Sequence, residues 1–264
     1  MMIIRIRSRR IVALAITFFL LSGLCACHPQ GSIGGNEAVS PAENERFADE
    51  KPALTIRHFT LDAGIENVDC SFEIPYMAGP SPAADSFNDF FLALYRDFSE
   101  KEPGRVREIL ASAAPGTPSE ENPYRDCWTA RVQNCSERWI SVSLSYDWYM
   151  GGVWDYGIDG YTFDRNTGQR LFLDDVLPGT EEAIQAAIAG GLKEQYPGIE
   201  DLADAQGNTP LTALEKIPIR DIDFYIAEGG AVTVVFDKYE IAPGAAGMFT
   251  VEVDWETASG PAHV

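Results

Sequence analysis

The chain has 264 residues, of which 45% are hydrophobic and 23% are charged, and its formal net charge is −20. This length allows one large domain or two small ones. The composition is that of an ordinary globular protein, so it excludes both wholesale disorder and a polytopic membrane protein. The acidic balance excludes a general electrostatic attraction to nucleic acid or to anionic lipid headgroups.

The first 27 residues have the organisation of an export signal. Four arginines lie between positions 5 and 10, and an uncharged apolar run follows from 11 to 21. This run is shorter than the roughly 20 residues of a permanent membrane-spanning helix, so cleavage is the preferred interpretation. The segment Leu24–Cys27, which reads Leu-Cys-Ala-Cys, resembles the lipobox of bacterial lipoproteins. The resemblance implies that Cys27 carries the lipid; an ordinary secretory signal or an uncleaved anchor is the alternative.

Processing makes the chain still more acidic. Loss of residues 1–27 removes four arginines and no acid, which leaves 16 basic and 40 acidic side chains and a net charge of −24. Such a surface would favour a basic partner, although acidic surface that only keeps the protein soluble is the plainer explanation. Residues 28–51 are rich in Gly, Ser, Pro, Asn and Glu, so we expect a flexible linker between lipid and domain.

Three cysteines remain after the tether, and they allow three alternative disulfides outside the cytoplasm: Cys70, Cys127 and Cys135. Sequence spacing does not choose between them. No Cys-x-x-Cys is present, and His28, His58 and His263 are scattered, so we expect no metal site and no cofactor.

The first half of the domain shows two strand patterns and one strong helix pattern. Apolar residues begin β-like runs at Leu54 and Val68. From Pro82 to Glu102, aromatic residues recur at three- and four-residue steps, which predicts a helix packed on a sheet, with Ser81 as its N-cap. A second short helix is expected at 106–113, followed by a strand around Trp128.

The stretch from residue 139 to 177 is the most regular part of the chain. Apolar residues at 140, 142, 144 and 146 alternate with serines at 141, 143 and 145, which predicts a strand with one buried face. The segment 164–168, Asp-Arg-Asn-Thr-Gly, predicts the turn of a hairpin.

The remainder predicts one more helix and three strands. Thr180 is a plausible N-cap of a helix that ends near Tyr196, and alternation predicts strands at 224–227, 231–236 and 248–253. Strands and helices in clusters, without regular βαβ alternation, indicate an α+β fold: an antiparallel sheet with helices packed on it. We expect two consecutive subdomains, residues 52–135 and 136–258.

Residues 140–175 and 222–255 resemble the extracytoplasmic region shared by RsiV-like anti-sigma factors, which sense lysozyme, and by PdaC-like peptidoglycan deacetylases. The motifs that carry this resemblance are Ile140-Ser141-Val142, Tyr149 with Gly151-Gly152, Phe163-Asp164, Thr167-Gly168, Leu171, Leu173, Asp174, Val234-Val235-Phe236, and Tyr239-Glu240-Ile241-Ala242-Pro243 ahead of Gly247. Residues 52–135 resemble the smaller domain that precedes it in those proteins.

Two departures from the family bear on function. Val153, Trp154 and Asp155 follow the glycine pair where the family commonly has Ala and His. Ten residues before the apolar run are too few for the cytoplasmic sigma-binding segment of those anti-sigma factors. The resemblance therefore implies a related outer domain on a protein that is not an anti-sigma factor itself.

Two sets of residues are singled out. The candidate binding surface, suited to a sugar ring or a protein anchor, is Tyr149, Gly151, Gly152, Trp154, Tyr156 and Tyr161, near Trp148. Burial of these aromatic residues in the core is the alternative, and exposure of Trp154 would separate the two. The residues assigned to backbone structure are Asp164, Gly168, Tyr239, Pro243 and Gly247.

The predicted function is a non-enzymatic binding or sensing module of a bacterial cell envelope, outside the cell and attached to the membrane only by its lipid, or secreted if unlipidated. Its expected partner is an envelope protein or a peptidoglycan component, with a basic protein such as lysozyme as one candidate. The alternative is a cell-wall glycan hydrolase that uses two carboxylates about 5 to 10 Å apart. The aspartates that could supply such a pair are too many to select: Asp155, Asp159, Asp164, Asp174, Asp175 and Asp237. The chain has no Gly-x-Ser-x-Gly elbow and no phosphate loop.

Overall fold

The computed structural model describes residues 53–112, 116–152 and 154–253. The export signal, Cys27 and most of the expected linker lie outside these residues. No helix in the described ranges is long and apolar enough to cross a membrane.

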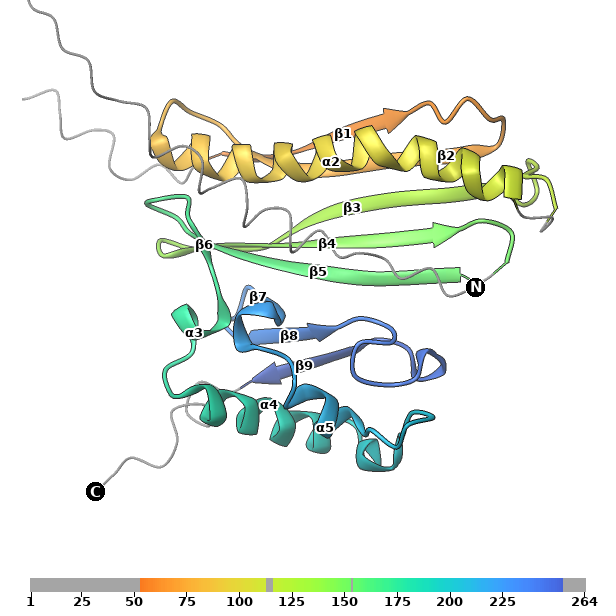
Figure 1. The fold of residues 1–264 in the computed structure, drawn as a ribbon. Helices are drawn as coiled ribbons and strands as arrows, with labels where there is room; N and C mark the ends of the chain where they lie inside the picture. Colours follow the sequence, from red (N-terminus) through yellow and green to blue (C-terminus); the bar gives the residue numbers. More distant parts are fainter. Residues whose placement is uncertain (1–52, 113–115, 153, 254–264) are drawn as a thin grey trace, which may run out of the picture. The chain divides into compact units, whose positions relative to one another are not determined.

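A six-stranded sheet forms the first part of the structure (Figure 1). Its strands follow chain order: β1 (Leu54–Leu61), β2 (Val68–Met77), β3 (Tyr124–Cys135), β4 (Trp139–Tyr149), β5 (Trp154–Asp164) and the two-residue β6 (Arg170–Leu171). Neighbours are antiparallel except β2 and β3, which are parallel because the helix α2 (Pro82–Ser112) crosses over between them. The predicted α+β class is confirmed, with this one parallel pair added to the expected antiparallel sheet.

The helix α2 is a single helix of 31 residues, where the sequence predicted two. Ser81 caps its start as predicted, with Oγ accepting from the backbone N–H of Ala84 at 3.1 Å. Its aromatic stripe packs on the sheet: the ring of Phe87 lies 4.9 Å from that of Phe163, and the ring of Phe98 lies 4.9 Å from that of Phe72. The helix continues past Pro103, a residue type that usually ends or kinks a helix.

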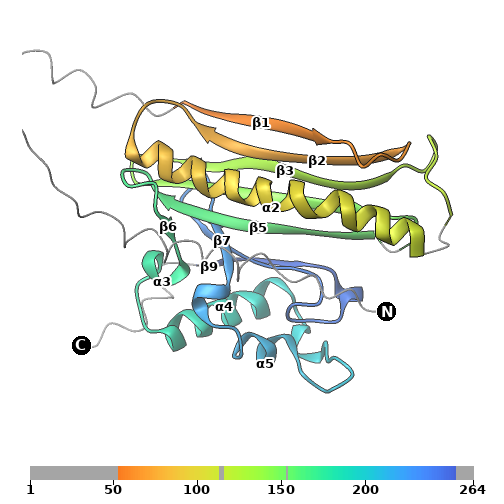
Figure 2. The ribbon, with the colours of Figure 1, turned by 45° about the horizontal axis from the view of Figure 1, so that its top comes forward.

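A smaller sheet follows, with β8 (Val232–Phe236) between β7 (Asp223–Ile226) and β9 (Phe249–Val253). The three strands lie within a residue of the predicted ranges 224–227, 231–236 and 248–253. The helices of this part are α3 (Leu173–Val176), α4 (Glu181–Gln195) and α5 (Pro210–Leu214), with 3-10 turns η2 (Ile199–Asp201), η3 (Ile219–Asp221) and η4 (Gly244–Ala246). Thr180 caps α4 by accepting from the N–H of Ala183. Figure 2 shows α4 and α5 on the side of the small sheet away from α2.

The serine face of β4 is buried, contrary to the prediction of a strand with one buried face. Ser141 is fully buried, and its Oγ accepts from the N–H of Ile226 in β7 at 2.8 Å and lies 2.5 Å from the hydroxyl of Thr162. A Cβ at Gly160 would lie 2.4 Å from the backbone of Phe224, so this glycine lets β7 approach β5 closely. The polar positions of the alternation therefore form the seam between the two sheets.

The change from one sheet to the other comes after Leu171. The boundary expected between residues 135 and 136 lies in the turn that joins β3 to β4, two strands of the same sheet. The alternating pattern of the two strands predicts how they pair. It does not predict where one compact unit of the chain ends and the next begins.

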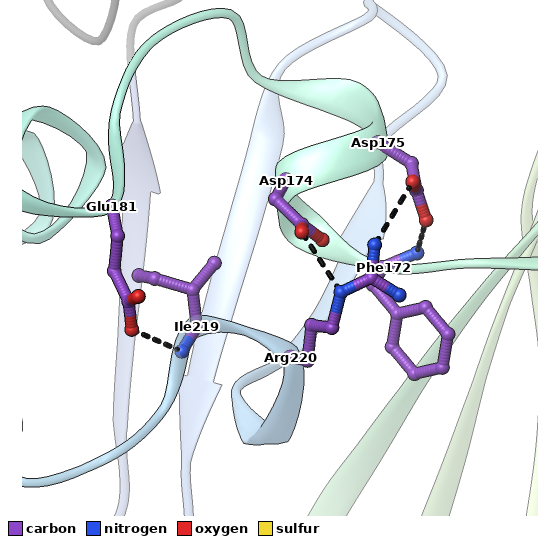
Figure 3. A network of polar contacts seen from close by, with 6 residues as sticks. All are labelled: Phe172, Asp174, Asp175, Glu181, Ile219 and Arg220. Carbon is purple, nitrogen blue, oxygen red and sulfur yellow. Dashed lines mark hydrogen bonds and ion pairs between the residues drawn. The ribbon is translucent and has the colours of Figure 1, made fainter.

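An exposed polar network fastens α3 to η3 in the second part (Figure 3). Arg220 Nε donates to Asp174 Oδ2 at 2.9 Å, and its Nη2 donates to Asp175 at 3.4 Å. Asp175 also accepts from the N–H of Phe172 at 2.9 Å, and the Arg220 guanidinium lies 4.9 Å from the Phe172 ring. The two neighbouring aspartates thus have a structural use at the start of α3.

The sheet keeps the three remaining cysteines apart. Cys70 and Cys127 lie on opposite faces of neighbouring strands, because Cys127 is registered with Ser71. Cys135 lies eight residues further along β3, roughly 26 Å at about 3.3 Å per residue. No pair among the three is placed for a disulfide, whose Cα atoms must lie within about 7 Å with their Cβ atoms facing.

Candidate functional site

The turn between β4 and β5 presents the first residues of the predicted surface. Gly151 has φ +78°, and a Cβ there would lie 2.0 Å from Tyr124 Oη. Gly152 is exposed with nothing within 4 Å of a built Cβ. Tyr149 is half-buried and packs edge-on against the ring of Tyr124. Gly151 and Tyr149 therefore support the buried Tyr124, and we assign them to the packing of the turn.

Trp154 opens β5 as an exposed side chain, with 58% of its surface accessible. Its Nε1 donates to Asp147 Oδ1 at 2.5 Å, and its ring lies 5.2 Å from that of Tyr156. Asp147 in turn pairs with Arg125 at 3.3 Å on β3. Trp154 is thus exposed and also held in one orientation, the outcome that favours a binding surface over a core position.

Tyr239 provides a second exposed aromatic ring, at 65% accessibility. Its φ is +66°, and Asn67 is the other non-glycine residue with positive φ in the described ranges. A Cβ at Gly244 would lie 1.9 Å from the Tyr239 ring, so the ring rests on the glycine at the start of η4. A tyrosine in this conformation is costly by about 1 to 3 kcal/mol, and such residues cluster at ligand clamps.

Lys238 contacts both residues that carry these exposed rings. Its Nζ donates to the carbonyl of Trp154 at 3.0 Å and lies 5.2 Å from the Tyr156 ring and 5.8 Å from the Tyr239 ring. Only 10% of the lysine side chain is exposed, and Asp155 lies 3.8 Å away as its counter-ion. One residue earlier, Asp237 accepts from the N–H of Ile158 at 3.0 Å. The segment after β8 is therefore bonded along the edge of β5.

We call Trp154, Tyr156, Lys238 and Tyr239 the aromatic patch. Trp154 and Tyr156 were predicted as surface residues from the sequence, whereas Tyr239 was assigned to backbone structure, and Lys238 and Asp147 were not predicted. No local signal could have found Lys238, because its contacts reach a residue 84 positions away.

Tyr161 was expected on the surface and lies in the core instead. It is 5% exposed, and its ring packs against Phe90 and Phe91 of α2 at 5.2 and 5.8 Å. Burial, together with the charge of nearby Asp159, raises the pKa of its hydroxyl well above the ordinary value. The period-2 alternation explains the error, because positions 156 and 161 differ by an odd number and point to opposite faces of β5.

The remaining motif residues shape the backbone. Asp164 Oδ1 accepts from the N–H groups of Asn166 and Thr167, which closes the β5–β6 turn as predicted. Gly168 has φ +68°, and a Cβ there would lie 2.1 Å from the carbonyl of Ala83. Pro243 precedes η4, and Gly247, at φ +82°, ends it beside Tyr156.

Each of the six aspartates considered for a catalytic pair has a bonding partner in the structure. Asp155 faces Lys238, Asp159 accepts from the Tyr161 hydroxyl, and Asp237 holds the edge of β5. Asp164 closes its turn, and the pair at 174 and 175 binds Arg220. No group of three or more metal-ligating side chains occurs within the described ranges. Chemically, the aromatic patch offers three aromatic rings, of which Trp154 and Tyr239 are exposed, and the largely buried ammonium group of Lys238.

Comparison with known proteins finds one family model that matches part of the chain. Residues 170–256 match the family described as Protein of unknown function (DUF3298). A crystal structure of a DUF3298 family member from Bacteroides fragilis is similar, with a TM-score of 0.57 and 17% identity over 80% of this chain and 94% of that one. A DUF3298 protein from Pseudomonas aeruginosa has a TM-score of 0.49 and 20% identity over the same shares. No curated protein matches the chain.

The aromatic patch spans the border of the matched segment. Lys238 and Tyr239 lie inside residues 170–256, whereas Trp154 and Tyr156 come from the preceding hairpin. The patch therefore exists only where the smaller sheet packs on the larger one.

Proposed function

We propose that the protein is a non-catalytic binding module, carried outside a bacterial cell on a lipid at Cys27, that captures a basic protein through the aromatic patch. The observation that carries this proposal is the pair of exposed rings, Trp154 and Tyr239, each fixed by a specific contact. Aromatic side chains that are rigid before binding contribute large contact area at little cost in entropy.

The backbone conformation of Tyr239 supports the same proposal. The left-handed conformation suits glycine or asparagine, and a tyrosine there lowers the stability of the free protein. An exposed ring in this position is of use for binding, whereas a turn with only a structural role does not need a tyrosine there.

Charge supports a basic protein as the partner. The processed chain carries −24, and acidic side chains border the patch at Asp147 and Asp155. A field of this sign accelerates encounter with a cationic protein and is screened by salt. The resemblance to RsiV-like proteins suggests lysozyme as the first partner to test.

The direct test uses residues 28–264, the processed chain without its lipid-bearing Cys27. We measure the affinity of lysozyme for this chain and for two variants, Trp154→Ala and Tyr239→Ala. Each substitution removes an exposed ring, so we expect a normal fold and a loss of affinity of about thirtyfold, the effect of a hot-spot residue. Isothermal titration calorimetry measures the affinity, and circular dichroism checks the fold.

Ile56→Ala is the matched control, because Ile56 is an exposed large apolar residue on β1, outside the patch. Its affinity for lysozyme should equal that of the unchanged chain. Equal affinities for all four proteins would show that the patch does not carry the binding.

A further inference from the structure

An apolar hollow of about 420 Å³ lies beside the aromatic patch. Its lining comes from the end of α4, from η2, from η4 and from β9: Gln195, Tyr196, Pro197, Gly198, Ile199, Leu202, Ala246 and Phe249. Leu202 is 38% exposed there, one of four large apolar side chains exposed in the described ranges. The ring of Tyr196 is fixed, because its Oη donates to the carbonyl of Thr250 at 2.9 Å and it packs edge-on against Phe249.

The turn η4 connects the hollow to the patch. Ala246 lines the hollow, while Gly244, two residues earlier, carries the ring of Tyr239. On the other side of Ala246, a Cβ at Gly247 would lie 3.5 Å from Tyr156 Oη. Tyr239 and Leu202, two of the four exposed large apolar side chains, therefore lie next to this turn, and the ring of Trp154 is linked to it through the ring of Tyr156.

The charges around the hollow indicate what would fill it. Between positions 193 and 202, exposed Glu194, Glu200 and Asp201 face solvent, against the single cation Lys193. An acyl chain or a neutral glycan would gain no charge attraction from these carboxylates. A peptide segment with a large apolar side chain between basic residues would bury its apolar group and place its cations beside the carboxylates.

From the apolar lining and the neighbouring carboxylates we infer that the hollow is a second contact site beside the aromatic patch. It receives a large apolar side chain from a basic segment of the partner. The inference rests on the proposed function, since it assigns a second contact to the same partner. It adds that the partner must carry an apolar residue flanked by lysine or arginine, and that Leu202 and Ala246 contribute to recognition.

The test uses capped pentapeptides and the ¹⁵N-labelled processed chain. A peptide with phenylalanine between pairs of lysines should shift the amide signals of Leu202 and Ala246, and it should bind at least tenfold more tightly than the same peptide with alanine in the centre. Ala246→Phe, which fills the hollow from an exposed position, should abolish these shifts. Ile56→Ala should leave them unchanged.

The outcomes separate the two proposals. Equal binding of the alanine peptide, shifts that avoid the hollow, or an equal response to a phenylalanine peptide flanked by glutamates would overturn the inference. A response that persists in Trp154→Ala, alongside lost lysozyme binding, would support both the pocket and the patch. A peptide response in a chain that does not bind lysozyme at all would support the pocket and contradict the proposed partner.

Discussion

At the scale of single residues, the surroundings of Cys127 change the pKa of its thiol. Its thiol is half-buried on β3, and burial, reinforced by the negative charges of Asp69 and Asp126, raises its pKa from 9.0 to about 11, although a hydrogen bond with Ser71 acts in the opposite direction. A thiol of this kind is protonated at neutral pH and is a poor nucleophile.

We predict that Cys127 in the folded chain reacts with iodoacetamide about a hundredfold more slowly at pH 8.5 than in the urea-unfolded chain, because its thiolate fraction is lower by that factor. Peptide mapping by mass spectrometry measures the rate. The same shift makes the folded state hold a proton that the unfolded chain has lost, so this thiol lowers stability as pH rises from about 9 toward 11. Equal rates in the two states would contradict the assigned burial.

At the scale of elements, local patterns predicted most strands and the caps of both long helices. The strands at 224–227, 231–236 and 248–253 and the helix after Thr180 lie within a few residues of their predicted bounds. The single long α2 and the burial of Ser141 were not predictable, because both depend on surfaces supplied by distant segments. The same holds for the aromatic patch. Trp154 could be predicted from the residues next to it in the sequence, whereas Lys238 could not, because its contacts are with a distant segment.

The seam between the two sheets gives a prediction at this scale. Gly160→Ala would place a Cβ 2.4 Å from the backbone of Phe224, which cannot move as a flexible side chain could. We expect a loss of about 2 kcal/mol or more in the free energy of unfolding, since the sheets must separate locally.

Urea denaturation measures this loss through the midpoint. Gly152→Ala is the matched control, because a Cβ there meets nothing within 4 Å and its backbone is not left-handed. Its midpoint should stay within experimental error of the unchanged chain. A midpoint for Gly160→Ala as high as that of the control would show that β7 does not approach β5 so closely.

At the scale of the whole molecule, the aromatic patch lies at the border of two sheets in an acidic domain, and the proposed lipid at Cys27 would tether that domain to a membrane. The large and small sheets are held together by the serine seam and by the segment after β8. Any change that separates the sheets should therefore also separate Trp154 from Lys238 and dismantle the patch. A substitution that weakens the contact between the sheets should therefore also weaken binding, although the residues of that contact are not those of the aromatic patch.

Titration of the processed chain with lysozyme at low and at physiological ionic strength tests the central claim most directly. We predict binding under both conditions, weaker at the higher salt concentration because the long-range attraction between a −24 surface and a cationic protein is screened. The apolar contacts of Trp154 and Tyr239 should preserve the remaining affinity. Absence of binding at both ionic strengths would contradict the claim that this domain captures such a basic protein.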